Sequence, residues 1–140
     1  MKLKLFGLFL ISLLFISACA DNTPPASDAV SEPINLETLP QTIDVQTALA
    51  IKDNEDVVLI DVREQWEYDE AHIPGVTLIP MSELESRLDE IPTDKTVVLT
   101  CRSGNRSGQV FTFLEQKGYD NTHNMAGGIL AWQAAGFAVE

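Results

Sequence analysis

The sequence is short of basic residues, cysteine and histidine, and each scarcity excludes a class of function. Only nine lysines and arginines stand against 21 acidic residues, which gives a formal net charge of −12. No basic run interrupts this acidity, so we expect no binding to nucleic acid through the overall field of the chain. Two histidines and two cysteines without a paired spacing indicate no metal site. The sequence shows no internal repeat, and its length of 140 residues allows one domain.

A long membrane-spanning run is also missing. The longest apolar segment, Leu5–Ile16, is shorter than the roughly 20 residues that a transmembrane helix requires. It follows Lys2 and Lys4 and precedes small residues, an arrangement typical of a secretory signal peptide. We therefore predict that residues 1–18 form a signal peptide. Its removal takes away two lysines and no acid, which changes the net charge from −12 to −14.

The end of this segment, Ile16-Ser17-Ala18-Cys19, resembles a bacterial lipobox. The resemblance implies that Cys19 is lipidated and that the protein is exported to the cell envelope, where a lipid anchor holds it to a membrane on the periplasmic side. The alternatives are an ordinary cleaved signal with a chance cysteine, and an uncleaved anchor. Residues 19–40, rich in Pro, Ser, Asn, Asp and Thr, are predicted to form a flexible tether. Cys101 is then the only free thiol, so no internal disulfide is expected.

Residues 41–140 alternate between short apolar runs rich in β-branched residues and more polar segments. Continuous apolar runs are typical of strands that are buried on both faces of a parallel sheet. The sequence therefore predicts an α/β domain whose parallel sheet has helices on both faces. The expected strands are Val57–Val62, Val76–Ile79, Thr96–Thr100 and Asn121–Met125. The expected helices are Val45–Lys52 capped by Asp44, a segment from a capping box at Ser82 to Ile91, Ser107–Lys117, and Ile129–Ala135.

The loop after the third predicted strand carries the clearest chemical signal. It begins with Cys101 and continues as Arg102-Ser103-Gly104-Asn105-Arg106 to the helix predicted at Ser107. Backbone N–H groups of residues 102–107 and the helix N-terminus can stabilise a thiolate at this strand end. Gly104 permits a backbone conformation that a side chain would forbid, and the two arginines can hold an oxyanion. The alternative is a buried, inert cysteine beside solvated arginines.

Three motifs resemble those of the rhodanese-like sulfurtransferases. They are CRSGNRS in the loop, LIDVREQWEYDEAHIPGV over Leu59–Val76, and GGILAW over Gly127–Trp132. They occur in the family's order, and the resemblance extends from about residue 43 to residue 139. Two small departures are Ala71, where the family often has glycine, and Val76, where it often has alanine. Residues 41–140 are accordingly expected to form a rhodanese-like domain.

This resemblance implies sulfur transfer through a persulfide on Cys101. The sulfur would come from thiosulfate or a similar donor and pass to cyanide or a thiol, which can belong to a protein. Arg102 or Arg106 would hold the sulfonate end of the donor, and no metal or organic cofactor is expected. The alternatives are a persulfide carrier or thiol-redox sensing module with little turnover, and a catalytically silent binding domain. The remaining residues expected to bind substrate are Ser103, Gly104, Asn105 and Ser107.

The length of the loop separates this prediction from a cysteine phosphatase. Phosphatases that share the rhodanese fold use a Cys-x5-Arg loop, which is wide enough to surround a phosphate. Here only four residues lie between Cys101 and Arg106, and no aspartate is clearly placed to protonate an ester leaving group. We therefore expect the loop to fit a sulfur atom better than a phosphoryl group.

Several other residues are expected to support the site rather than to react. Asp61 and Arg63 end a predicted buried strand, where an ion pair is favoured over direct catalysis. His72 lies in the His-Ile-Pro-Gly motif and is expected to fix a loop by hydrogen bonds. The remaining histidine, His123, carries no motif. Two aromatic residues, Trp66 and Tyr68, are candidates for the pocket wall, and core packing is favoured for Trp132.

Overall fold

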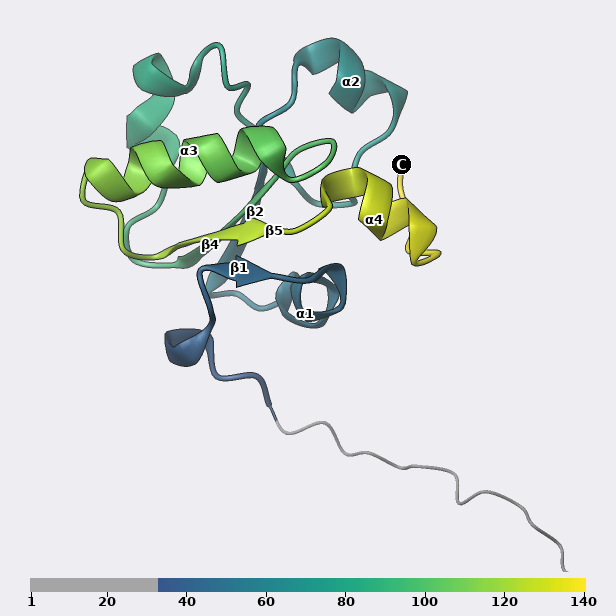
Figure 1. Ribbon diagram of the computed structural model, residues 1–140, viewed down its shortest axis with the longest axis horizontal. Coiled ribbons are helices and arrows are strands. Elements are labelled where there is room, and N and C mark those ends of the chain that lie inside the picture. The colour runs from purple at the N-terminus through teal and green to yellow at the C-terminus, as the bar shows by residue number, and fades with distance from the viewer. Residues whose placement is uncertain (1–32) are drawn as a thin grey trace, which may run out of the picture. The chain divides into compact units, whose positions relative to one another are not determined.

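The computed structural model describes residues 33–140 (Figure 1). The predicted signal peptide at 1–18, the lipidation site Cys19 and most of the predicted tether lie outside these residues. Within the described part, none of the helices has both the length and the apolar character needed to cross a membrane.

Five parallel strands form one sheet in the order β1-β5-β4-β2-β3. The central pair, β2 and β4, aligns Val57 with Thr96 and Asp61 with Thr100. Because both strands run in the same direction, their carboxyl ends meet at one edge of the sheet, where loops can form a site. The parallel α/β architecture predicted from the sequence is confirmed. The strands are β1 (Thr42–Ile43), β2 (Val57–Asp61), β3 (Thr77–Leu78), β4 (Thr96–Thr100) and β5 (Thr122–Met125).

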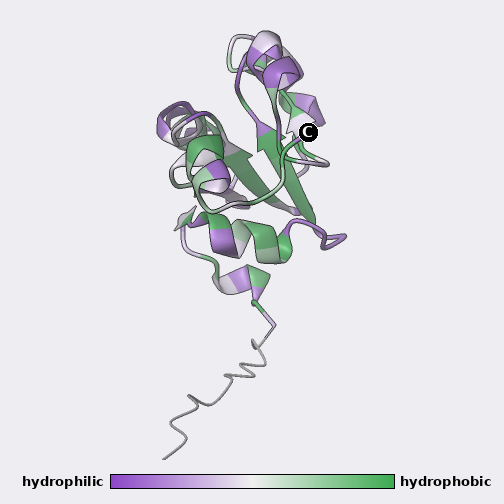
Figure 2. Cartoon of the chain, turned by 90° about the vertical axis from the view of Figure 1, so that its right-hand side faces the viewer, coloured by the Kyte–Doolittle hydropathy of each residue, from purple (hydrophilic) through white to green (hydrophobic). Residues whose placement is uncertain are grey.

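Helices cover both faces of the sheet and create two hydrophobic clusters. One cluster joins α1 and α4 to the sheet, and the other joins α3 and the 3-10 segment η2 to it. Successive side chains of one strand point to opposite faces of the sheet, so Leu59 of β2 belongs to the first cluster and Ile60 to the second. The strands accordingly appear hydrophobic between more polar helices (Figure 2). The helices are α1 (Val45–Ile51), α2 (Gln65–Glu70), α3 (Asn105–Gln116) and α4 (Gly128–Ala134), with 3-10 segments η1 (Leu36–Thr38) and η2 (Leu84–Glu90).

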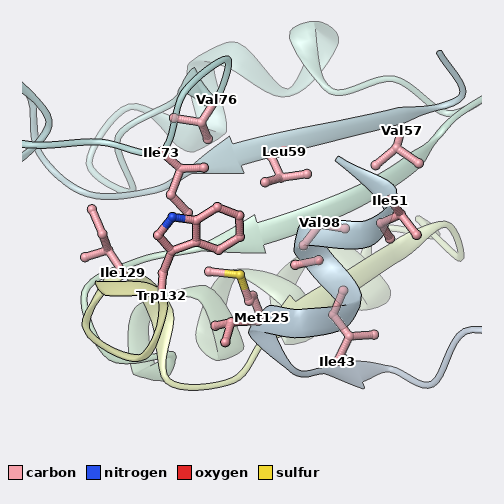
Figure 3. Packing of buried hydrophobic residues seen from close by; sticks show 12 residues of the cluster. Ile43, Ile51, Val57, Leu59, Ile73, Val76, Val98, Met125, Ile129 and Trp132 are labelled. Atoms are coloured by element: carbon pink, nitrogen blue, oxygen red, sulfur yellow. The ribbon is translucent and has the colours of Figure 1, made fainter. Parts of the chain in front are cut away.

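Trp132 of α4 lies in the middle of the first cluster, beside Ile73, Met125 and Ile129 (Figure 3). The side chain is almost fully buried at 1% exposure, and its Nε1–H donates to the carbonyl of Ala138 at 2.8 Å. A buried indole is stable in this place because its polar atom has a partner. The core role predicted for Trp132 is confirmed.

The helix predicted from Ser82 to Ile91 is not an α-helix. Residues Leu84–Glu90 form 3-10 turns, interrupted at Arg87, whose φ of −123° is not helical. The Ser82 hydroxyl does not cap this segment, because it donates instead to the Glu64 carboxylate at 3.0 Å. The predicted capping box was therefore wrong, since a partner 18 residues away takes the capping side chain.

Other parts of the fold also differ from the expected ones. The short helix α2 was not predicted, because its six residues are mostly polar and show no apolar period. Helix α3 begins at Asn105, two residues before the predicted start. The folded part also begins before residue 41, since Leu36 and Leu39 of the predicted tether pack against the first cluster.

Candidate active site

Cys101 follows β4 directly, and the loop after it turns tightly into α3. Its side chain is buried, with 1% of the residue exposed. The backbone N–H of Gly104 donates to Sγ at 3.1 Å, and the hydroxyl of Ser107 donates to Sγ at 3.4 Å. Gly104 is the N-cap of α3 and has a φ of +91°, a left-handed conformation that favours glycine. The predicted cradle around the sulfur and the predicted need for glycine are both present.

The surroundings of Cys101 stabilise its thiolate. Burial acts to raise the pKa of this thiol, but hydrogen bonds from the Ser107 hydroxyl and the amides of Ser107, Ser103 and Gly104 act against it. The hydrogen bonds prevail, so the pKa of Cys101 lies below its ordinary value. Because the thiolate is the nucleophilic form, the loop increases the reactive fraction of Cys101 near neutral pH.

Helix α4 holds the same loop from its carbonyl side. The N–H of Ile129 donates to the carbonyl of Cys101 at 2.8 Å, and the N–H of Leu130 donates to that of Arg102 at 3.1 Å. Gly128 permits this approach, since a Cβ at that position would lie 2.2 Å from the Cys101 carbonyl oxygen. In the sequence, Gly127 and Gly128 stood out only as the start of the GGILAW motif. Their role in fixing the cysteine loop depends on the packing of α4, which local patterns do not reveal.

The two loop arginines have different surroundings. The Arg106 guanidinium binds both carboxylate oxygens of Glu67 in α2, at 2.6 and 2.7 Å. Arg102 is exposed, and among residues 33–140 its side chain makes no ion pair. From the sequence, either Arg102 or Arg106 was expected to hold the sulfonate end of the sulfur donor. Because Glu67 already binds Arg106, Arg102 is the arginine of this loop that is available to an anion. Glu67 was not predicted as a site residue, because its partner lies 39 residues away.

The Glu67–Arg106 pair is charged at neutral pH. The hydrogen bond from Arg106 lowers the pKa of Glu67 below its ordinary value, although burial opposes this effect. Glu67 also accepts from the backbone N–H of Glu64 at 3.2 Å, which ties the pair to the first turn of α2. The pair therefore joins α2 to the start of α3 beside the cysteine loop.

Asp61 and Arg63 form the predicted ion pair at the carboxyl end of β2. Arg63 binds Asp61 at 2.7 Å, and both residues are at most 4% exposed. The same guanidinium donates to the carbonyls of Glu67 at 3.1 Å and Ala71 at 2.8 Å. Every polar end of this buried arginine has a partner, so its role is to fix α2 and its C-cap Ala71 relative to β2.

His72 fixes the chain end rather than contacting the sulfur. Its Nδ1 lies 3.0 Å from the carbonyl of Tyr68, and the two rings stack with centroids 3.7 Å apart. Its backbone exchanges two hydrogen bonds with Glu140, at 2.8 and 2.9 Å. The other histidine, His123, approaches the carbonyl of Pro40 through Nδ1 at 2.8 Å. No group of metal-ligating side chains is present within residues 33–140.

The last two residues predicted to bind substrate lie on the outside of the loop. Ser103 and Asn105 are exposed, and the amide of Ser103 contributes to lowering the pKa of Cys101. Beside the loop is an open hollow of about 210 Å³, which Arg102 lines together with residues of α2 and α4. Trp66 lies in its wall, as expected for one of the two aromatic candidates, whereas Tyr68 packs against the first hydrophobic cluster.

Comparison with known sequences and structures gives one consistent family. The Rhodanese-like domain model matches residues 44–135. The chain is 42% identical over 89 residues to a sulfurtransferase of Allochromatium vinosum, which covers 64% of this chain and 83% of that protein. It is 30% identical to the thiosulfate sulfurtransferase GlpE of Pseudoalteromonas translucida, over 66% of this chain and 89% of GlpE. It is also 34% identical to the putative sulfur carrier protein YrkF of Bacillus subtilis, of which it spans about half, 49%.

Among solved structures, a rhodanese-related protein from Thermoplasma volcanium superimposes with a TM-score of 0.63 at 31% identity. The match covers 72% of this chain and 98% of that protein. With a family match over residues 44–135 and the same fold in a relative of this identity, the chain belongs to the rhodanese-like domain family.

Proposed function

We propose that the protein is a sulfurtransferase that carries sulfane sulfur as a persulfide on Cys101. The observation that carries this proposal is the sulfur cradle, in which the Gly104 amide and the Ser107 hydroxyl donate to Sγ. Such donors stabilise a sulfur anion, both before and after a second sulfur atom is added. The names of two relatives, a sulfurtransferase and a thiosulfate sulfurtransferase, support the same chemistry.

In the first half-reaction, the Cys101 thiolate attacks the outer sulfur of thiosulfate or a similar donor. A new S–S bond forms, the bond between the outer sulfur and the sulfonate sulfur breaks, and sulfite leaves with the electron pair. Arg102 binds the sulfonate end and stabilises the departing charge, because Arg106 is held by Glu67. This arginine supplies a local attraction for an anion on a chain whose net charge is −12.

In the second half-reaction, a thiolate or cyanide attacks the outer sulfur of the persulfide. The S–S bond breaks, Cys101 leaves as a thiolate, and the acceptor keeps the sulfur. The two steps balance without an external oxidant or reductant, and they predict ping-pong kinetics. The cradle favours the second step as well, since it stabilises the leaving thiolate of Cys101.

The test is to incubate the purified protein with thiosulfate and to record its intact mass and the release of thiocyanate after cyanide is added. We expect the mass of one extra sulfur atom on the wild type and none on Cys101→Ser. Failure to add sulfur to the wild type would refute the proposal. Sulfur addition without turnover would favour the persulfide carrier, for which the burial of Cys101 is the supporting observation.

We also propose that the protein is exported and anchored to a membrane through a lipid on Cys19. The support is the sequence before that residue, a short apolar segment after two lysines and the junction Ile16-Ser17-Ala18-Cys19. Membrane fractionation of cells that express the wild type and Cys19→Ala tests this proposal. The wild type should sediment with membranes and the variant should not. Identical soluble behaviour of both would refute the anchor.

A further inference from the structure

The hollow beside the cysteine loop carries charges of both signs. It measures about 210 Å³, and its lining includes Arg63, Trp66, Glu67, Glu70, Arg102 and Leu130. Two of its walls belong to α2 and α4, and the third is the residue that follows Cys101. Because the Ile129 and Leu130 amides bind the carbonyls of Cys101 and Arg102, the α4 wall and the loop form one connected surface.

Two of the four charged side chains in this hollow already have partners. Arg63 is bound by Asp61 and by two backbone carbonyls, and Glu67 is bound by Arg106. Among residues 33–140, the side chains of Arg102 and Glu70 make no ion pair or hydrogen bond. The hollow therefore offers one available cation and one available anion.

The hollow also exposes two large apolar side chains. Trp66 of α2 is 62% exposed and Leu130 of α4 is 47% exposed. Exposed apolar residues that gather around a polar recess are typical of a ligand site. Trp66 and Leu130 can contact the carbon chain of a ligand whose charged ends bind the two polar groups.

We propose that the thiol acceptor is a small zwitterionic amino-acid thiol, with its carboxylate on Arg102, its ammonium group on Glu70 and its carbon chain between Trp66 and Leu130. This inference rests on the proposed sulfur transfer and names the acceptor class for the same site. The acceptor thiolate attacks the outer persulfide sulfur, the S–S bond to Cys101 breaks, and the Cys101 thiolate leaves. Arg102 serves the sulfonate of the donor and the carboxylate of the acceptor in turn, as a ping-pong cycle permits.

The kinetic test uses four thiols that differ in charge. The protein is loaded with thiosulfate, freed of excess donor and mixed with L-cysteine, cysteamine, 3-mercaptopropionate or 2-mercaptoethanol. Transfer rates of the wild type and Glu70→Gln are compared for each thiol, so that the intrinsic reactivity of the thiol cancels. Asp69→Asn is the matched control, because it removes one exposed charge from the same helix outside the lining of the hollow.

We expect Glu70→Gln to slow transfer to L-cysteine and cysteamine about two- to fivefold, the size of one exposed charge pair. Transfer to 3-mercaptopropionate should not slow, because that thiol has no ammonium group. Asp69→Asn should leave all four rates unchanged. An equal effect of Glu70→Gln on all four thiols, or an equal effect of the two variants, would overturn the inference.

A binding measurement separates this inference from the proposed reaction. S-methyl-L-cysteine has the same zwitterion but no free thiol, so it should shift the Trp66 indole N–H resonance in the wild type and less so in Glu70→Gln. Binding without persulfide formation would refute the sulfur transfer and leave the zwitterion site standing. Persulfide formation without this binding would refute the site and leave the sulfur transfer standing.

Discussion

Replacing Gly128 by alanine should displace the cysteine loop, because the start of α4 lies in direct contact with that loop. Gly128 has a φ of +55°, and an added Cβ would lie 2.2 Å from the Cys101 carbonyl oxygen and 2.6 Å from the Arg102 carbonyl carbon. Both atoms belong to the backbone and cannot move aside by a change of rotamer. Helix α4 must therefore retreat from the loop, or the loop must shift.

The expected cost has three parts. A left-handed conformation costs an alanine about 1–2 kcal/mol, and forced overpacking costs about 1–3 kcal/mol. Retreat of α4 also weakens the bonds from the Ile129 and Leu130 amides, at 2.8 and 3.1 Å. Each such bond contributes about 0.5–1.5 kcal/mol. The sum is about 3–8 kcal/mol, a large share of the 5–15 kcal/mol by which native domains are usually stable.

The assay is urea unfolding of Gly128→Ala beside Gly136→Ala. Gly136 has a φ of +78°, but no atom lies within 4 Å of the place where a Cβ would stand. Its replacement should cost only the conformational part, about 1–2 kcal/mol. If the two variants unfold at the same urea concentration, the close approach of Gly128 to the loop is not what matters. Where Gly128→Ala remains folded, slower persulfide loading should reveal the displaced loop.

Three other substitutions test the site. Ser107→Ala removes a donor to the thiolate, so the pKa of Cys101 should rise and the acid limb of the pH profile for persulfide loading should move to higher pH. Glu67→Gln should lower the free energy of unfolding by about 1–3 kcal/mol at neutral pH. Because pairing with Arg106 lowers the pKa of Glu67 from 4.5, this stabilisation is present above that pH. The stability difference, measured by urea unfolding, should shrink as pH falls through the folded-state pKa. With cyanide as the acceptor, Arg102→Gln should raise the KM for thiosulfate by a larger factor than it lowers kcat. An unchanged KM would contradict the role of Arg102 in binding the donor.

The sequence predicts the local structure of the cysteine loop well because its signals are local. The strand Thr96–Thr100 was predicted to the residue, since five β-forming residues end at one polar loop. The cap of α1 is equally local, and the Asp44 carboxylate accepts from the Thr47 amide at 2.7 Å. Gly104 has the positive φ that the turn requires. Each of these features depends on residues a few positions apart.

The parts that the sequence did not predict depend on residues that are distant in the chain. Glu67 and Arg106 are separated by 39 positions and are joined only by the packing of α2 beside α3. Ser82 is of a residue type that often caps helices, but its hydroxyl donates to Glu64, which lies 18 positions earlier in the chain. In both cases a local pattern suggests a role, and tertiary packing assigns the polar group to another partner.

Cys101 is held on two sides by the starts of two helices, and this arrangement constrains how the site can work. The Gly104 amide, at the start of α3, donates to its sulfur, whereas the Ile129 amide of α4 donates to its carbonyl. These bonds hold the residue at its side chain and at its carbonyl, and Cys101 is 1% exposed, so the proposed reaction requires a substrate that can reach a buried sulfur. Since Glu67 occupies Arg106, Arg102 is the exposed cation of the cysteine loop, and Glu70 is an exposed anion in the lining of the same hollow. In the proposed sulfur transfer, this single loop cation suits a substrate with one anionic end in either half-reaction.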